Sequence, residues 1–274
     1  MNTSGPPASS DDELIREHYR KVAEAHGESP RSSMEDDQVR ERELQFLTGA
    51  FRVLRQRNSG ALRVLDLGCG NGYALSRMLP LAGYADQFWG VDFSPELLQI
   101  AQGRKLERCT LSQGDARALR FEAGFFDFVY TERCLINILE WEGQRKALQE
   151  IARVLKPGGT YLMIECFTDG LESNNKARAD CGLPAIKAAY HNKYFDKQSF
   201  EEAVTGAFEV MDPAAEFLMP SNFLSSYYFV SRVLYPSLTK GEVVRNSEVA
   251  KFFSFLPPVG NYSPIQAQVL RKRN

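Results

Sequence analysis

The sequence predicts an α/β fold built on a doubly wound, mostly parallel, seven-stranded sheet with helices on both faces. Short apolar runs alternate with helical patterns between residues 60 and 167, at the spacing of βαβ units. Helical patterns also precede this region, and a long helical segment precedes the last apolar run. Because parallel crossovers are right-handed, they place the helices on both sides of the sheet.

The region before the sheet is predicted to be helical. Residues 1–10 are small, polar and contain prolines, which is typical of a disordered tail. Residues 11–59 hold two helical patterns, interrupted by "GESPRSSMED", and Asn58 marks the end of the second. We therefore expect an N-terminal helical extension.

Five strands and three helices are expected in the central region. The strands are "ALRVLDLG", "QFWGVDFS", "CTLSQGDA", "FDFVYTE" and "TYLMIECF". The helices are "YALSRMLPLA", "PELLQIAQGRK" and "EGQRKALQEIARVLKPGG". Ser94 is the expected N-cap of the second helix, with Pro95 at its first position. A Pro-Gly-Gly stop is expected to end the third.

The alternation loosens in residues 168–274, which we expect to complete the sheet and add a cap. A helix, "DKQSFEEAVTGA", and a possible strand, "FEVMDPAAEFLM", are followed by the aromatic-rich, helical "SNFLSSYYFVSRVLYPSL". "IQAQVLRKR" is the expected last strand. Because a bare loop of this length is uncommon in a compact domain, residues of about 220–263 are predicted to form a helical cap that is inserted before that strand and binds the acceptor.

Composition argues against several classes of protein. The 274 residues carry a net charge of −2, without the basic excess of a nucleic-acid-binding surface. No apolar run approaches the roughly 20 residues that span a bilayer, and the start lacks the apolar region of a secretory signal. The five cysteines form no C-x-x-C pair. We therefore expect a soluble, cytoplasmic protein with reduced thiols, no metal site and no membrane or nucleic-acid partner.

The stretch "VLDLGCGNGYALSRML", residues 64–79, has the context of a nucleotide-binding turn. Gly68, Gly70 and Gly72 alternate after a strand and before a helix. A residue without a Cβ atom lets the backbone turn tightly and lie against a ligand. A dinucleotide fingerprint would place its third glycine where Tyr73 stands, and Asp66 lies two residues before the first glycine.

This combination resembles the first motif of class I S-adenosylmethionine-dependent methyltransferases. The resemblance continues through "GVDFSPELLQIA", "GDAR", "FDFVYTE" and "LQEIARVLKPGGTYLMI", and it covers residues 60–167. It implies a Rossmann-like core that binds S-adenosylmethionine and releases S-adenosylhomocysteine. It also implies that the N-terminal helices, residues 11–59, cover the cofactor site.

The resemblance further implies which residues bind the cofactor. Asp92 would accept two hydrogen bonds from the ribose diol, and Asp115 would meet the adenine amino group between Phe93 and Ala116. Asp66 would lie near the methionine amino group, and the full set is Asp66, Gly68, Gly70, Asp92, Phe93, Asp115, Ala116 and Thr131. Each acid also has a structural alternative: that Asp66 orients the turn, that Asp92 caps a helix, and that Asp115 is a solvated loop acid.

Catalysis needs little from the protein, because methyl transfer from a sulfonium is an in-line displacement. A general base helps when the acceptor is a hydroxyl, an ammonium or an acidic carbon. Glu132, after the fourth strand, and His191, in "AAYHNKYFD", are the candidate catalytic residues. Their structural alternatives are a helix-start acid and a hydrogen-bonded loop histidine. Glu165 is either functional or part of a structural pair.

Three hypotheses describe the acceptor. The neutral-to-acidic charge and the late aromatic segment favour a small molecule, a sugar or a natural-product scaffold, and hence a biosynthetic role. RNA or protein is the second hypothesis, although "TERC" stands where enzymes that methylate base nitrogens often have an Asn/Asp-Pro-Pro-Tyr motif. The third is a protein that binds the cofactor or its product without transferring methyl. The sequence leaves open whether O, N or C is methylated, and the oligomeric state.

Overall fold

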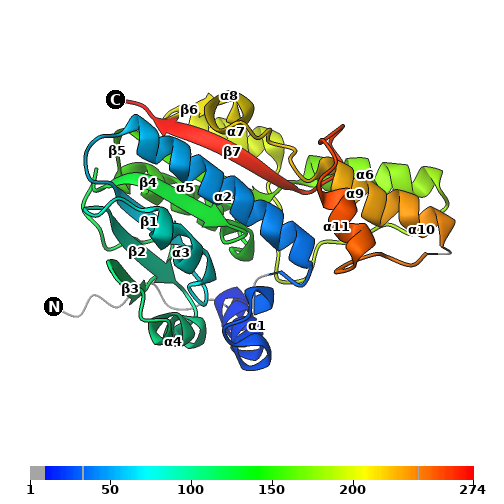
Figure 1. Cartoon of the computed structure of the whole chain (residues 1–274), viewed down its shortest axis with the longest axis horizontal. Coiled ribbons are helices and arrows are strands. Elements are labelled where there is room, and N and C mark those ends of the chain that lie inside the picture. Colours follow the sequence, from blue (N-terminus) through cyan, green and yellow to red (C-terminus); the bar gives the residue numbers. More distant parts are fainter. Residues whose placement is uncertain (1–9, 33, 240) are drawn as a thin grey trace.

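The central sheet has a parallel part and an antiparallel part. The computed structural model describes residues 10–32, 34–239 and 241–274, and within them a seven-stranded sheet has the order β3-β2-β1-β4-β5-β7-β6 (Figure 1). The pairs among β1–β5 are parallel, whereas β7 pairs antiparallel with both β5 and β6. The predicted fold class, a doubly wound and mostly parallel sheet, is confirmed.

Apolar runs form the strands because the sheet is covered on both faces. Val64, Leu65 and Leu67 of β1 are almost completely buried, as are Phe128, Val129 and neighbouring residues of β4. The strands are β1 (Arg63–Leu67), β2 (Gln87–Asp92), β3 (Cys109–Gln113), β4 (Phe126–Glu132), β5 (Leu155–Cys166), β6 (Phe208–Met211) and β7 (Ile265–Lys272).

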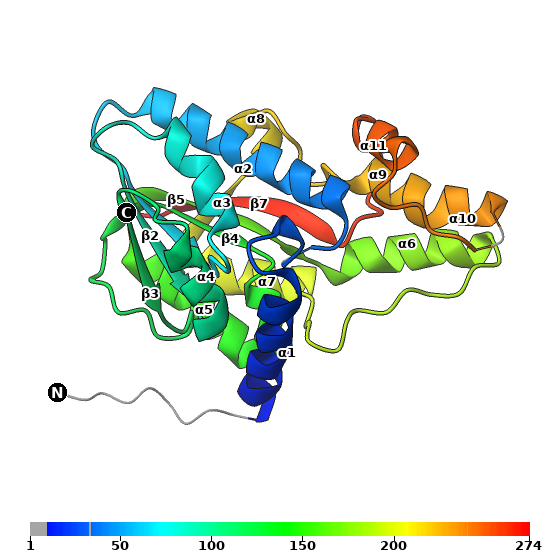
Figure 2. The ribbon, with the colours of Figure 1, turned by 60° about the horizontal axis from the view of Figure 1, so that its bottom comes forward.

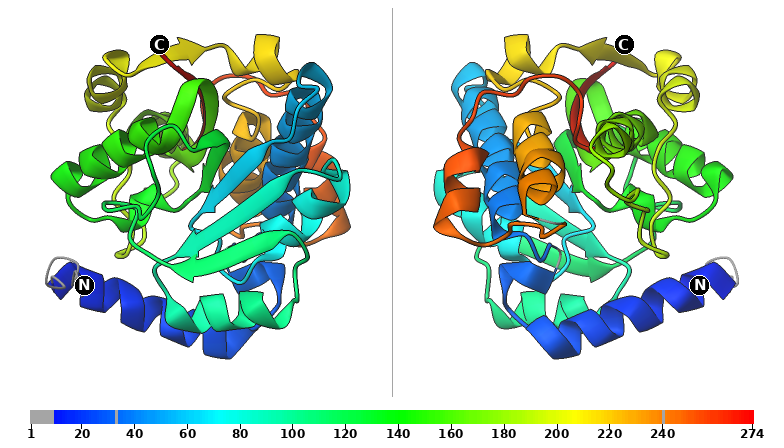
Figure 3. Two further views of the ribbon diagram at one scale, coloured as in Figure 1. Left: turned by 90° about the vertical axis from the view of Figure 1, so that its left-hand side faces the viewer. Right: turned by 90° about the vertical axis from the view of Figure 1, so that its right-hand side faces the viewer.

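Helices cover both faces of the sheet. The helices α2 (Asp37–Arg57) and α3 (Tyr73–Met78) lie on one face, and α5 (Trp141–Val154) and α7 (Lys197–Thr205) lie on the other (Figure 3). The helix α4 (Pro95–Gly103) begins at the predicted N-cap, where the Ser94 hydroxyl accepts a hydrogen bond from the Leu97 amide. The first helix, α1 (Ser10–His26), packs along α4.

The remaining helices gather at one end of the sheet as a lobe (Figures 1 and 2). The lobe consists of α6 (Thr168–Asp180), α9 (Ser225–Phe229), a π-helical turn (Val230–Leu234), α10 (Tyr235–Leu238) and α11 (Glu248–Ser254). The short helix α8 (Pro213–Phe217) and three 3-10 turns, η1 (Pro30–Ser32), η2 (Leu79–Leu81) and η3 (Leu135–Asn137), complete the description. Helices therefore do lie between β6 and β7, as the sequence predicted.

Three local expectations were wrong or incomplete. The stretch "FEVMDPAAEFLM" is strand only to Met211, because Asp212 caps α8 and Pro213 lacks the amide that a strand would use. Pro-Gly-Gly lies within β5, beside an irregularity in the pairing with β4, and α5 has already ended at Val154. The helix α6 was not predicted, since "TDGLESNNKARAD" has no apolar stripe.

The packing of α6 explains how it forms without such a stripe. Its buried residues are Gly170, Asn174 and Arg178. A Cβ atom on Gly170 would clash with the backbone of Ser263, so the helix is held by close backbone approach. Asn174 and Arg178 donate hydrogen bonds to backbone carbonyls of other segments.

Two further expectations concern the N-terminal tail and membrane-spanning helices. Of the predicted disordered tail, residues 1–9 lie outside the described part of the chain, and Ser10 already belongs to α1. Among the residues that the structure describes, no helix combines the length and the apolar character that crossing a membrane requires.

Candidate cofactor site

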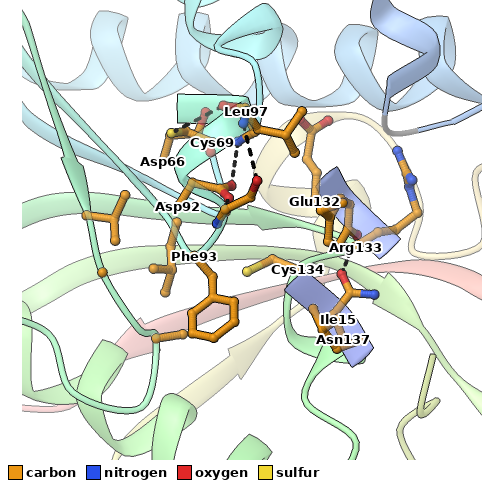
Figure 4. A pocket seen from close by; sticks show the side chains of 18 of the residues that line it. Ile15, Asp66, Cys69, Asp92, Phe93, Leu97, Glu132, Arg133, Cys134 and Asn137 are labelled. Atoms are coloured by element: carbon orange, nitrogen blue, oxygen red, sulfur yellow. Dashed lines mark hydrogen bonds between the residues drawn. The ribbon is translucent and has the colours of Figure 1, made fainter. Parts of the chain in front are cut away.

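A cleft opens at the carboxyl ends of β1, β2 and β4, with about 1070 Å³ of empty space when the open solvent at its mouth is included (Figure 4). Ligands of open α/β sheets bind at this edge. Its walls come from the glycine turn after β1, the ends of β2 and β4, the loop after β3, and α1 and α2. The cleft brings together most of the predicted site residues, namely Asp66, Gly68, Gly70, Asp92, Phe93, Asp115, Ala116 and Glu132.

The glycine turn needs glycine for two physical reasons. Gly68, Gly70 and Gly72 have φ values of +84°, +53° and +74°, in the left-handed region that side chains disfavour. A Cβ atom on Gly68 would also lie 2.5 Å from the Cys134 sulfur. The turn therefore exposes backbone to the cleft where any side chain would obstruct it.

Asp92 ties this turn to α4. Its carboxylate oxygens accept hydrogen bonds from the Gly70 amide at 2.6 Å and the Ser94 amide at 2.8 Å. A carboxylate has about four acceptor positions, so two remain for a ligand diol. Burial raises the pKa of Asp92, while the backbone amides oppose that rise.

Asp66 is a buried carboxyl group that lacks a hydrogen-bond partner at one oxygen. Its residue is 2% exposed, Oδ2 has no hydrogen-bond partner in the structure, and the buried Tyr130 hydroxyl lies close enough to the carboxyl to oppose part of the rise in its pKa. Burial, followed by the negative charge of Glu132, raises the pKa of Asp66 well above its usual range. An unsatisfied buried carboxyl costs free energy, so a cationic ligand group beside it would be stabilised.

Asp115 is already paired. Arg117 donates to both of its oxygens and also contacts Asp12 of α1 at 2.9 Å. Nearby, the guanidinium of Arg16 lies 4.6 Å from the centre of the Phe93 ring. The two acids and Arg117 thus attach α1 to the edge of the cleft.

A buried ionic network borders the cleft beside Asp66. Arg40 and Glu43 of α2 meet Glu132 and Arg133 at the end of β4, with Arg40–Glu132 at 2.9 Å and Arg133–Glu43 at 2.7 Å. The Nε atom of Arg40 has no partner. Burial raises the pKa of Glu132, and the charge of Arg40 opposes this. Arg133 has a φ of +53°, a strained value at the mouth of a cleft.

The sequence interpretation missed Arg40 and Glu43. The sequence did contain a signal for them. Residues 40, 43, 44 and 47 share one face of α2, and the last two are buried leucines, so Arg40 and Glu43 lie on the apolar face. Charged residues on an apolar face are seldom buried unless paired. Tyr19, which also lines the cleft, was not predicted to bind a ligand either.

Glu165 has a structural arrangement. Its carboxylate accepts hydrogen bonds from the amides of Cys134, Leu135 and Ile136, at 2.9, 3.0 and 3.3 Å. It thereby caps η3, the turn that follows β4. Burial raises the pKa of Glu165 to about 7, against the effect of these amides.

Thr131, His191 and the cap do not line the cleft. Thr131 is fully buried in β4, with its hydroxyl 2.9 Å from that of Tyr161. His191 lies behind Asn137, whose side chain donates to the His191 carbonyl at 3.0 Å. Residues 220–263, predicted to bind the acceptor, contribute no lining residue. In the described ranges, no three His, Cys, Asp or Glu side chains group as metal ligands.

The central residues match a known family. Residues 64–159 fit the sequence model of a family described as "Methyltransferase domain". The core of this chain is a class I methyltransferase domain. Over 108 residues it is 38% identical to the demethylmenaquinone methyltransferase of Lactococcus lactis, an alignment covering 38% of this chain and 42% of that protein. Over 120 residues it is 37% identical to the enzyme of the same name from Leptospira interrogans, covering 42% and 47%.

These alignments cover less than half of this chain. The chain spans less than half the length of these curated relatives that it matches. Over almost the whole chain the fold is similar to that of solved structures. One is the [4+2]-cyclase SpnF, with a TM-score of 0.56, 19% identity and 99% of each chain covered. Another belongs to the complex of the Haloferax volcanii Trm112 methyltransferase activator, with a TM-score of 0.57, 17% identity, and 98% of this chain and 100% of that chain covered.

Proposed function

We propose that this methyltransferase domain uses S-adenosylmethionine to methylate a small-molecule acceptor, a sugar or a natural-product scaffold. One observation carries the proposal. The Asp92 carboxylate holds the amide of Gly70 in a left-handed glycine turn, inside a cleft that also gathers Asp66, Phe93 and Asp115. This is an arrangement suited to a nucleoside bearing an amino-acid group.

Each end of the cofactor has a chemically suitable partner in this proposal. Asp92 receives the ribose hydroxyls, and Phe93 and Ala116 flank the adenine. Asp66 receives the ammonium of the methionine moiety, because its Oδ2 is buried and unpartnered. Arg40 receives the carboxylate, because its Nε is an unused donor at the cleft and guanidinium groups bind carboxylates well. Bound there, the cofactor would supply an electrophilic methyl group.

The chain's own residues align the acceptor and exclude water. Ile15 of α1 is 5% exposed and lines the cleft, so α1 shields the reaction centre. Glu132 is the residue we assign to accept a proton from the acceptor, since it lines the cleft while Arg40 favours its ionised form. His191 receives no proton in this proposal, because it lies outside the cleft.

Charge and similarity support a small acceptor. The net charge is −2, without the basic excess that RNA binding favours. The curated relatives are named for a small molecule, demethylmenaquinone. Their similarity covers only 38% and 42% of this chain, so it supports the class of acceptor rather than its identity.

A second candidate function is binding of the cofactor without methyl transfer. The observation that favours it is the similarity in fold to a protein named as a [4+2]-cyclase. A fold can serve several chemistries, and the cleft geometry described above fits either function.

Calorimetric titration with S-adenosylhomocysteine tests the cofactor site. Asp92→Ala should bind it on the order of 100-fold more weakly, through the loss of charged hydrogen bonds to the ligand and the turn. Asp180→Ala, which removes an exposed acid of α6, is the matched control and should bind as the wild type does. Equal affinity of wild type and Asp92→Ala would contradict the ribose assignment.

Labelled S-adenosylmethionine tests the acceptor. Incubation with a metabolite extract should place label in the small-molecule fraction. Label in RNA or protein would overturn the proposed acceptor class. Tight binding of S-adenosylhomocysteine with no transfer to any fraction would favour the second candidate function.

A further inference from the structure

Two histidines meet face to face where α1 crosses the cleft. His18 of α1 and His191 of the loop before α7 stack with ring centres 3.7 Å apart and planes 21° from parallel. The His18 Nδ1 atom lies 3.1 Å from the Tyr190 hydroxyl. Beside them Tyr19 donates to the Asn137 side chain at 2.6 Å. Since Asn137 in turn donates to the His191 carbonyl, α1, η3 and the loop are joined at one place.

Among the residues that the structure describes, this polar attachment lies between two others along α1. At the start of the helix Asp12 contacts Arg117. Just after its end, the Asn71 side chain donates to the carbonyls of Gly27 and Ser29 at 2.8 and 3.0 Å. The middle attachment differs from the other two because it contains two imidazole groups, whose ordinary pKa lies near neutral pH.

Protonation is unfavourable in this arrangement. The Nδ1 atom of His191 is buried without a partner, and an imidazolium must donate from both nitrogens. The groups facing the pair are Lys21 and Tyr19 from α1, Tyr190 from the loop and the Asn137 amide from η3. An added proton therefore meets a second imidazole and a lysine instead of a carboxylate.

The pKa directions agree with the geometry. Burial, helped by His18, lowers the pKa of His191 from 6.5 to about 4. Burial, followed by the charge of Lys21, also lowers the pKa of His18.

We propose that the His18–His191 stack is a pH-sensitive latch, which holds α1 closed over the cleft while both rings are neutral and releases it when one is protonated. The latch is independent of methyl transfer. It controls whether the cleft is covered, whatever ligand enters.

The lowered pKa values determine in which direction pH changes the closure of α1. A histidine released from the stack regains its ordinary pKa of 6.5, so the closed state is fully favoured above that pH and loses stability as the pH falls toward 4. For His191 alone, the ratio of closed to open α1 should fall roughly tenfold between pH 7.5 and 5.5.

Hydrogen exchange of the α1 amides, without ligand and corrected for intrinsic rates, measures this ratio. Wild type should lose about tenfold protection between pH 7.5 and 5.5, whereas His191→Gln should change by about twofold or less. His26→Gln, on the same helix but outside the stack, is the control and should behave as wild type. Asp66 and Glu132 also have shifted pKa values, but both residues are present in all three proteins. Their titration therefore cannot cause a difference in protection between the variants.

The latch is overturned if wild type and His191→Gln change in α1 protection by the same factor between pH 7.5 and 5.5. Dissociation of S-adenosylhomocysteine gives a second readout and should accelerate on acidification in wild type more than in His191→Gln. If this ligand fails to bind at any pH while α1 protection still responds, the proposed function fails and the latch remains.

Discussion

The cofactor half, residues 60–167, and the C-terminal half, residues 168–274, are stabilised in different ways. In the first, local features set the geometry: left-handed glycines, the Ser94 cap and continuous apolar strands. In the second, long-range polar contacts do so. Asp36, ahead of α2, accepts a hydrogen bond from Tyr227 at 2.8 Å and forms an ion pair with Arg232. The geometry of residues 60–167 depends on residues that are neighbours in sequence. The packing of residues 168–274 depends on partners almost 200 positions away.

Buried polar atoms without a hydrogen-bond partner occur in both regions. Beside the cleft, Asp66 and Arg40 each keep one such atom, and in the lobe Asn174 keeps one at Oδ1. At the contact between α2 and the lobe, Asp36 instead pairs with Tyr227 and Arg232. Unsatisfied buried groups are costly, and the two beside the cleft are those that the proposed cofactor would satisfy.

The largest expected effect is in the glycine turn. Gly68→Ala combines a φ of +84° with a methyl group 2.5 Å from the Cys134 sulfur, so it should destabilise the protein by about 2–4 kcal/mol. Gly49→Ala is the matched control, in α2 with open space around it, and should stabilise by about 0.5–1 kcal/mol. Urea unfolding measures both. If the two variants had equal free energies of unfolding, the explanation that local features set the geometry of residues 60–167 would be wrong.

The next effect concerns Glu165, where the two halves meet. With a pKa raised from 4.5 to about 7, this group stabilises the fold fully below pH 4.5, and the contribution is lost as the pH rises through 7. Wild type should lose about 2–3 kcal/mol more than Glu165→Gln between pH 5 and 7.5, since the amide cannot ionise. Urea titrations at the two pH values check this, and parallel losses in both proteins would refute it.

A smaller effect is expected at the contact between α2 and the lobe. Tyr227→Phe removes a hydrogen bond to buried Asp36 and should cost about 1.5–2 kcal/mol of unfolding free energy. Affinity for S-adenosylhomocysteine should stay within about twofold, because Tyr227 does not line the cleft. Tyr84→Phe, at a residue 97% exposed, is the control. A large loss of ligand affinity in Tyr227→Phe would show that the two halves are coupled.

The smallest effect separates the two ends of the cofactor. Arg40→Lys keeps a charge beside Glu132 but removes the unpartnered Nε donor. Affinity for S-adenosylhomocysteine should fall about 5- to 10-fold. Affinity for 5′-methylthioadenosine, which lacks the amino-acid group, should not change. Calorimetry measures both affinities. If Arg40→Lys lost the same factor of affinity for the two ligands, Arg40 would lie outside the carboxylate site.

Local patterns account for what the sequence predicted well. The turn at Gly68 and Gly70, the N-cap at Ser94 and the apolar strands depend on residues a few positions apart, so they can be recognised without a structure. The helix α6 could not be predicted because its packing depends on Gly170 approaching Ser263, which is distant in sequence. Arg40 was missed for a similar reason, since its partner Glu132 belongs to another element.

The sequence by itself determined the sheet, the glycine turn and the acids that gather at its edge, because backbone geometry and apolar periodicity are local properties. Only the tertiary structure decided how charged and aromatic side chains pair across the fold. It placed Arg40 beside Glu132, positioned Glu165 as a cap for η3, and stacked His191 on His18 outside the cleft. Pairing of this kind depends on distances between elements, and those distances exist only when the whole chain has packed.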